Sequence, residues 1–151
     1  MAVAVLLAGG CGIRSTDVVE VGAPATAQIG TPGREGPTLY FQGPDGLMPV
    51  VRPYGEEVGP GKVFAMLMAG PTAAERVAGL RTELPSFQGF SELMRSQGGV
   101  LIRLHGPVRG LSAVARQQLV CTAAHFGGKS GITTVRINGT DGDIGAESCL
   151  V

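Results

Sequence analysis

The pattern of apolar and polar positions separates the first 37 residues from the rest of the chain. Residues 2–8 are all apolar and uncharged, whereas residues 12–37 mix small, polar and charged residues without a face that could be buried. A run as short as residues 2–8 cannot cross a bilayer as a helix. We therefore expect a flexible linker ahead of a single folded domain that occupies residues 38–151.

The folded part begins with a predicted hairpin and a buried helix. Residues 38–42 and 47–52 are rich in strand-forming residues, and the turn sequence Gly-Pro-Asp-Gly lies between them. Residues 61–69 predict a buried helix, because apolar side chains cover most of its circumference.

A second, short helix is predicted directly after the first. Gly70 and Pro71 end the first helix, since proline cannot continue its hydrogen bonds. Thr72 and Glu75 then have the spacing of a capping box, in which each side chain satisfies a backbone N–H of the other residue. Gly79 suits the left-handed position that ends such a helix.

The next stretch is less regular. Residues 81–85 are expected to be extended, with Thr82 facing the core and Pro85 at the end. Residues 86–98 have mixed polarity, and we expect one helical turn over residues 90–94.

The last part of the chain predicts two strands on either side of a long helix. Residues 100–104 are the clearest candidate for a central strand, residues 132–138 predict another strand, and residues 139–145 predict a polar turn. Ser112 caps a helix that runs to about residue 126.

One side of this long helix is predicted to face the core, with Val120 pointing away from it and Cys121 at its edge. The core-facing side consists of Leu111, Val114, Ala115, Leu119, Thr122 and Phe126. The whole pattern predicts a small α+β domain, in which a mixed β-sheet carries two main helices on one face.

Composition narrows the function. The 151 residues include 12 Lys plus Arg and 12 Asp plus Glu, so the formal net charge is zero. A balanced chain lacks the electrostatic footprint of a nucleic-acid binder, and we expect no nucleic-acid partner. The hydrophobic share of 44% argues against a wholly disordered chain.

The apolar start ends in a sequence that resembles a bacterial lipobox, Ala8-Gly9-Gly10-Cys11. This resemblance implies that residues 1–10 are a lipoprotein signal peptide and that Cys11 is acylated and becomes the new N-terminus. Residues 11–37 would then tether the domain to the outer face of the cell membrane. The alternative is that residues 2–8 form a buried strand ending in an ordinary cysteine.

The chain contains three cysteines, which allow two interpretations. If Cys11 is acylated, Cys121 and Cys149 remain, and a domain outside the cytosol often pairs such a remainder. The alternative is two free buried thiols in a cytosolic protein.

A metal site near these cysteines is a further possibility. Cys121 and His125 are four residues apart on the predicted helix, so that, together with Cys149, they provide three potential ligands. Structural zinc sites normally close with four ligands, so we expect no metal and no cofactor. The other histidine, His105, precedes a Gly-Pro turn and is expected to be solvated.

Four short motifs follow one another within residues 38–138: Leu-x-Pro-Val-x-Arg, Leu-x-x-Gly-Pro-Thr-x-x-Glu, Gly-Leu-x-Thr-x-Leu-Pro and Gln-Leu-x-x-Thr. Together they resemble the GerMN domain of sporulation and germination proteins and of many actinobacterial lipoproteins. The residues that carry the resemblance are Leu47, Pro49, Val50, Arg52, Leu67, Gly70, Pro71, Thr72, Glu75, Gly79, Leu80, Thr82, Leu84, Pro85, Gln118, Leu119 and Thr122.

The resemblance implies a non-enzymatic envelope module, similar to ring-building domains that associate through sheet and helix faces. No catalytic residue and no small-molecule substrate are implied. The expected partner is a cell-envelope protein or another copy of the chain, in sporulation, germination or envelope assembly. The alternative is a secreted or cytosolic enzyme with a hydrolase or metal site near Cys121, His125 and Cys149.

Overall fold

The computed structural model describes residues 36–54, 57–87, 89–96, 98–127 and 133–151. The predicted signal peptide, Cys11 and nearly all of the predicted linker lie outside the described residues.

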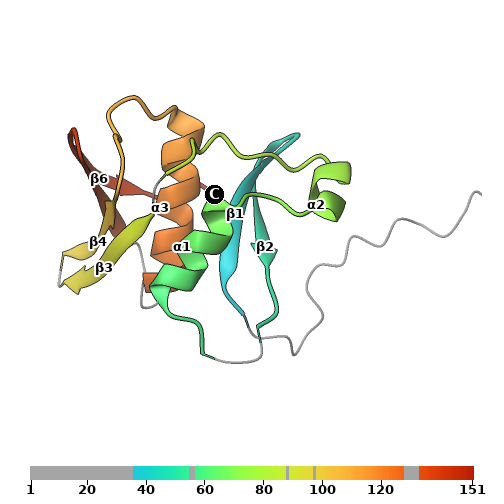
Figure 1. The fold of residues 1–151 in the computed structure, drawn as a ribbon, viewed down its shortest axis with the longest axis horizontal. Helices are drawn as coiled ribbons and strands as arrows, with labels where there is room; N and C mark the ends of the chain where they lie inside the picture. Colours follow the sequence, from blue (N-terminus) through green and yellow to red (C-terminus); the bar gives the residue numbers. More distant parts are fainter. Residues whose placement is uncertain (1–35, 55–56, 88, 97, 128–132) are drawn as a thin grey trace, which may run out of the picture.

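The described residues form six strands and three helices in the order ββααββαββ (Figure 1). These elements are β1 (Thr38–Gly43), β2 (Gly46–Val51), α1 (Pro60–Met68), α2 (Ala73–Val77), β3 (Phe90–Ser96), β4 (Gly99–Leu104), α3 (Ala113–Gly127), β5 (Thr134–Gly139) and β6 (Gly142–Ser148).

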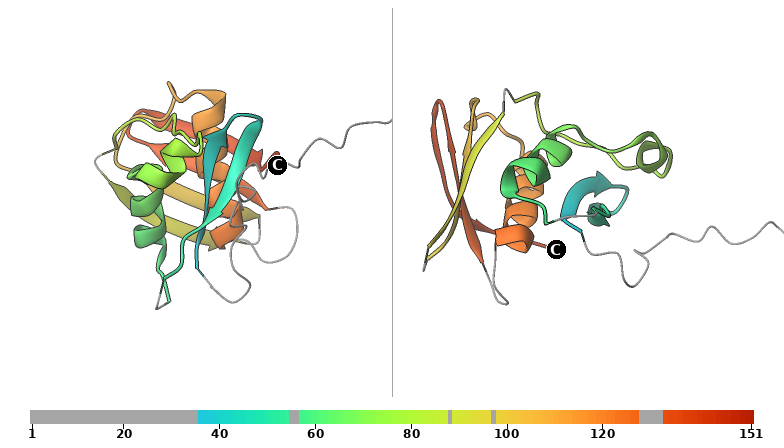
Figure 2. Two further views of the ribbon diagram at one scale, coloured as in Figure 1. Left: turned by 90° about the vertical axis from the view of Figure 1, so that its right-hand side faces the viewer. Right: turned by 60° about the horizontal axis from the view of Figure 1, so that its bottom comes forward.

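The elements are arranged in three layers. A four-stranded sheet has the order β3-β4-β5-β6, in which β4 and β5 are parallel and the other neighbours are antiparallel. The hairpin of β1 and β2 forms a separate antiparallel sheet. Helices α1 and α3 lie between the four-stranded sheet and the hairpin, whereas α2 projects beyond the hairpin side of the molecule (Figures 1 and 2).

The prediction of an α+β fold with a mixed sheet and two main helices on one face is confirmed. The sequence did not predict that the hairpin would cover the opposite side of those helices as a second sheet. This placement explains why residues 38–41 are all buried: Leu39 and Phe41 belong to the central core, and the backbone of Tyr40 faces α3.

The prediction for Val120 is wrong for the same reason. Val120 is fully buried, although it points away from the expected core-facing side of α3. A helix that is enclosed on two sides buries residues around most of its circumference. A prediction based on one apolar stripe therefore misses the buried residues on the opposite side.

The predicted helical turn over residues 90–94 is also wrong, because this stretch lies within strand β3. β3 is an edge strand paired with β4, with a register irregularity between Phe90 and Glu92. Phe90 stacks on Phe64 of α1, with ring centroids 4.4 Å apart and planes 3° from parallel. Glu92 is exposed, and the mixed polarity is that of a strand with one covered face.

The predicted polar turn over residues 139–145 is too long. Strand β6 already begins at Gly142, and Ile144 lies opposite the buried Ile137 of β5. Gly142 and Gly145 obscured this strand, since glycine is unfavourable in strands. Residues 81–85 are extended as expected, but they add only one bridge, between Arg81 and Gln42 of β1.

The enclosed position of α3 can be tested with two valine substitutions. Val120→Ala removes a fully buried side chain, so we expect the free energy of unfolding to fall by about 2 kcal/mol. Val77→Ala is the matched control, because Val77 is 91% exposed and a change within about 0.5 kcal/mol is expected. Equal effects in urea denaturation would contradict the three-layer arrangement.

Candidate functional site

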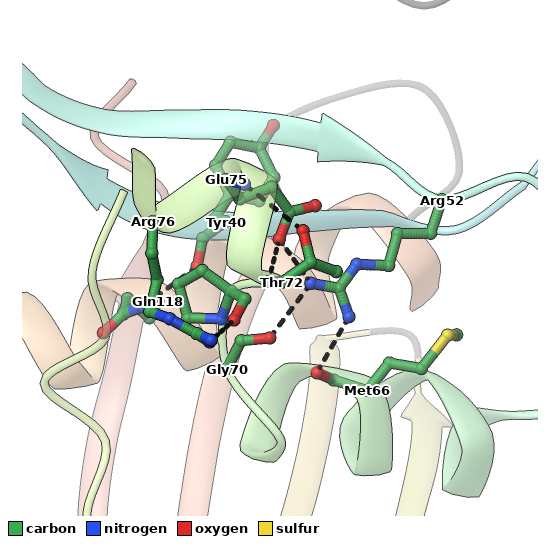
Figure 3. Close-up of polar contacts among 9 residues, drawn as sticks. Tyr40, Arg52, Met66, Gly70, Thr72, Glu75, Arg76 and Gln118 are labelled. Atoms are coloured by element: carbon green, nitrogen blue, oxygen red, sulfur yellow. Dashed lines mark hydrogen bonds and ion pairs between the residues drawn. The ribbon is translucent and has the colours of Figure 1, made fainter. Parts of the chain in front are cut away.

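The residues of the predicted motifs gather where the hairpin meets the two consecutive helices. Arg52 follows β2 and reaches across to the end of α1 (Figure 3). Its Nη2 donates to the carbonyl of Gly70 at 3.0 Å and to Oε2 of Glu75 at 2.7 Å, and its Nη1 donates to the carbonyl of Met66 at 3.4 Å. The guanidinium also lies 5.3 Å from the ring centroid of Phe41.

Glu75 links this arginine to the start of α2. The backbone N–H of Thr72 donates to the Glu75 carboxylate at 2.6 Å, and the N–H of Glu75 donates to the Thr72 hydroxyl at 3.3 Å, so the predicted capping box is confirmed. Burial opposes ionisation of Glu75. The hydrogen bonds from Arg52 and Thr72, together with the charge of Arg52, outweigh that effect and hold the pKa of Glu75 below its ordinary value of 4.5.

Both ends of the α2 segment use glycine in the left-handed region, which the sequence predicts for Gly79 but not for Gly70. Gly70 has a φ of 76° and is followed by the buried Pro71, and Gly79 has a φ of 90°. After α2, the N–H of Leu80 donates to the carbonyl of Glu75 at 2.9 Å, and the N–H of Gly79 donates to the carbonyl of Arg76 at 3.0 Å. This hydrogen-bond pair is the Schellman motif.

Helix α2 buries none of its own residues. Its position is therefore set by the capping box, the Schellman motif and the contacts of Arg52, and not by packing against the core.

A second group of polar contacts connects the hairpin to α3. Gln118 is fully buried, and its Nε2 donates to the carbonyl of Tyr40 at 3.1 Å. Its Oε1 accepts from the N–H of Glu83 at 2.9 Å and from the hydroxyl of Thr82 at 3.4 Å. One turn further along α3, the Thr122 hydroxyl accepts from the N–H of Tyr40 at 3.1 Å.

These contacts turn the half-buried Thr82 toward α3, in agreement with the expectation that it faces the core, whereas Pro85 at the end of the segment is exposed. Thr122 accepts from the N–H of Tyr40, and Gln118 donates to its C=O. These are the two backbone groups of Tyr40 that form no hydrogen bond with β2. The outer edge of β1 is thus satisfied by side chains at Tyr40 and by the backbone of Arg81 at Gln42.

An open pocket lies beside the α2 segment and has a volume of about 410 Å³. Arg76 contributes to its wall, and Nη1 of this residue donates to the carbonyl of Pro71 at 2.5 Å (Figure 3). The pocket is lined by Ala69, Gly70, Pro71, Arg76, Leu80, Arg81 and Thr82.

The two remaining cysteines meet at the C-terminal end of the chain. The sulfur atoms of Cys121 and Cys149 lie 2.04 Å apart, as in a disulfide. The same region is attached to α3 by an ion pair between Arg116 and Glu147 at 3.0 Å and by the N–H of Leu150, which donates to Gln117 at 3.1 Å.

This arrangement bears on the alternative metal or hydrolase site. With both sulfurs joined, Cys121 and Cys149 offer no thiolate to a metal ion or a substrate. His125 is exposed and makes an edge contact with the ring of Tyr40, at a centroid distance of 6.3 Å. Among the residues that the structure describes, no group of three or more His, Cys, Asp and Glu side chains could hold a metal ion. His105 is exposed, as predicted.

Within the described part of the chain, no helix has both the length and the apolar character needed to cross a membrane. Comparison with protein-family models, with curated proteins and with solved structures finds no match to this chain.

The sequence identified most of the residues of this region but not their partners. The resemblance includes Arg52, Glu75 and Gln118, yet nothing in the sequence indicates which backbone groups they bind. Arg76 and Arg81, which line the pocket, were not identified as site residues. The only signal for them is that both arginines flank the predicted turn at Gly79.

The ion pair of Glu75 predicts a pH-dependent contribution to stability. We expect Glu75→Gln to lower the free energy of unfolding by about 2 kcal/mol at pH 7, because the mostly buried Arg52 loses a charged partner. The pKa of Glu75 is lowered in the folded state, so this contribution is complete above the unfolded-state pKa and is lost as the pH falls through the folded-state pKa.

Urea denaturation of both proteins between pH 7 and pH 2.5 measures this difference. Glu92→Gln is the control, because its ion pair with Arg103 is exposed and contributes less than about 1 kcal/mol. A difference for Glu75→Gln that stays constant down to the lowest pH would contradict the assignment.

Proposed function

We propose that this chain is a membrane-anchored extracytoplasmic lipoprotein, attached through Cys11, whose folded part is a non-catalytic GerMN-like binding or scaffold module. The observation that carries the proposal is the use of the motif residues. The side chains of Arg52, Glu75, Thr82 and Gln118 all form hydrogen bonds within the domain. Nε of Arg52 is buried and has no hydrogen-bond partner among the described residues. These contacts give the residues a structural role, which agrees with the non-enzymatic module that the resemblance implies.

The cysteine arrangement supports the proposed location. Disulfides persist mainly outside the cytosol, and Cys121 and Cys149 lie at bonding distance. Cys11 is the third cysteine of the sequence and does not belong to this pair. An acylated Cys11 would give each of the three cysteines a role that suits the cell envelope.

The start of the fold supports the proposed tether. β1 begins at Thr38, directly after the predicted linker, so that the whole of residues 38–151 would lie beyond the lipid anchor. A flexible coil of the length of the predicted linker has a reach of roughly 25–30 Å, which would hold the domain clear of the lipid headgroups.

The proposed partner is a cell-envelope protein or a second copy of the chain, in sporulation, germination or envelope assembly. Strand addition to β2 is disfavoured, since Pro49 removes a backbone donor from its middle. β3 and β6 are the edge strands of the four-stranded sheet. Neither contains a proline, so each residue has a backbone N–H that could pair with an added strand.

Mass spectrometry of the protein purified from bacterial membranes tests the proposal. We expect a mature chain that begins at Cys11 and carries a diacylglyceryl group, with a mass decrease of two hydrogens from the Cys121–Cys149 bond. Cys11→Ala is the matched control and should retain residues 1–10 and lack the lipid.

A chain that keeps residues 1–10 and three free thiols would overturn the proposed anchor and location. Copurification with the envelope, compared between the natural chain and Cys11→Ala, then identifies the partner.

A further inference from the structure

The pocket beside α2 is lined by two arginines that have no carboxylate partner in the described part of the chain. Arg76 uses one N–H on the carbonyl of Pro71, and the Arg81 side chain is exposed. Among the described residues, neither guanidinium forms an ion pair. Of the acidic residues next to them in sequence, Glu75 binds Arg52 and Thr72, and the Glu83 carboxylate accepts from the Ser112 hydroxyl. The residues that line the pocket include two guanidinium groups and no carboxylate.

The walls of the pocket are otherwise mainly apolar. Ala69, Pro71 and Leu80 supply aliphatic surface next to the two arginines. A volume of about 410 Å³ is within the range of small ligand sites. An apolar hollow with two guanidinium groups suits an anionic group attached to an aliphatic body, since arginine binds carboxylates through paired hydrogen bonds.

The backbone around the pocket is fixed in advance. Gly70 and Gly79 adopt left-handed conformations, and the Schellman motif orients Leu80. Arg81 is attached to β1 by two backbone hydrogen bonds with Gln42, of 2.9 and 2.8 Å. A site held in this way loses little conformational entropy when a ligand binds.

We propose that this pocket binds a carboxylate-bearing side chain of an acidic segment of a partner polypeptide, with Arg76 and Arg81 as the recognition residues. This inference rests on the proposed function of the domain as a binding module, and it specifies the chemistry of the partner. It does not depend on the lipid at Cys11. The pocket is open to solvent, so it suits one side chain of a larger partner better than a whole small molecule.

A membrane surface is a weaker candidate for the same charge. Electrostatic binding to anionic lipids uses clusters of about four to eight basic residues, whereas this pocket has two arginines. The observations therefore favour an acidic polypeptide.

The test follows the side-chain Nε–Hε signals of Arg76 and Arg81 by NMR, in the full chain carrying Cys11→Ala. The probe is the peptide acetyl-Leu-Glu-Leu-Glu-amide, and the same peptide with glutamine in place of glutamate is its neutral counterpart. We expect saturable shifts at both arginines with a dissociation constant of about 1 mM or lower. The neutral peptide should bind about tenfold more weakly, since it cannot accept charge-assisted hydrogen bonds.

Two substitutions and one control locate the binding. Arg81→Gln should weaken binding of the acidic peptide about tenfold, and its fold should be unaffected because that guanidinium has no partner among the described residues. Arg76→Gln should act similarly. Arg136→Gln is the control, because Arg136 is exposed on β5 and forms no ion pair within the described residues.

The proposal is overturned if the neutral peptide binds as well as the acidic one, if Arg136→Gln weakens binding as much as Arg81→Gln, or if no saturable shift occurs. Stronger binding to phosphatidylglycerol vesicles than to the acidic peptide would replace it with a membrane contact. None of these results alters the mass-spectrometric test at Cys11, so failure of this pocket and failure of the lipoprotein assignment can be told apart.

Discussion

The fold depends on how α3 satisfies the backbone of β1. A strand whose edge lies against a helix lacks the backbone hydrogen bonds that a neighbouring strand would supply on that side. Each buried N–H or C=O without a partner costs about 1–3 kcal/mol of stability. Gln118 and Thr122 supply the missing partners for Tyr40, and Gln118 at the same time holds the extended segment through Glu83. This joint lets a two-stranded hairpin close the hydrophobic core on the side opposite the four-stranded sheet, where it buries Leu39 and Phe41.

The features that local chemistry determines could be predicted from the sequence. The hairpin turn, the capping box of Thr72 and Glu75, and the left-handed Gly79 each follow from a few neighbouring residues. The features that were missed depend on distant partners. β3 is a strand because β4 lies beside it, and Val120 is buried because the hairpin covers α3. The partners of Gln118 are 35 and 78 residues away in the chain, a separation that periodicity does not reveal.

The same contacts explain how a helix without buried residues can frame a pocket. Arg52 and Glu75 fix α2 from the hairpin side, while the bridge between Gln42 and Arg81 fixes the chain that returns from it. The motif residues thereby form contacts within the domain, whereas Arg76 and Arg81 beside them keep N–H groups that no described residue accepts and that we propose for a partner. A domain of this kind suits the proposed envelope lipoprotein, in which the anchor sets the location and the folded part provides the contact surface.

Hydrogen exchange of the Tyr40 amide measures whether Gln118 and Thr122 hold the hairpin against α3. We expect this amide, which donates to the buried Thr122 hydroxyl, to exchange only on global unfolding, as slowly as the amides in the middle of α3. Exchange of Tyr40 at the rate of an unprotected amide, while α3 stays protected, would contradict this arrangement.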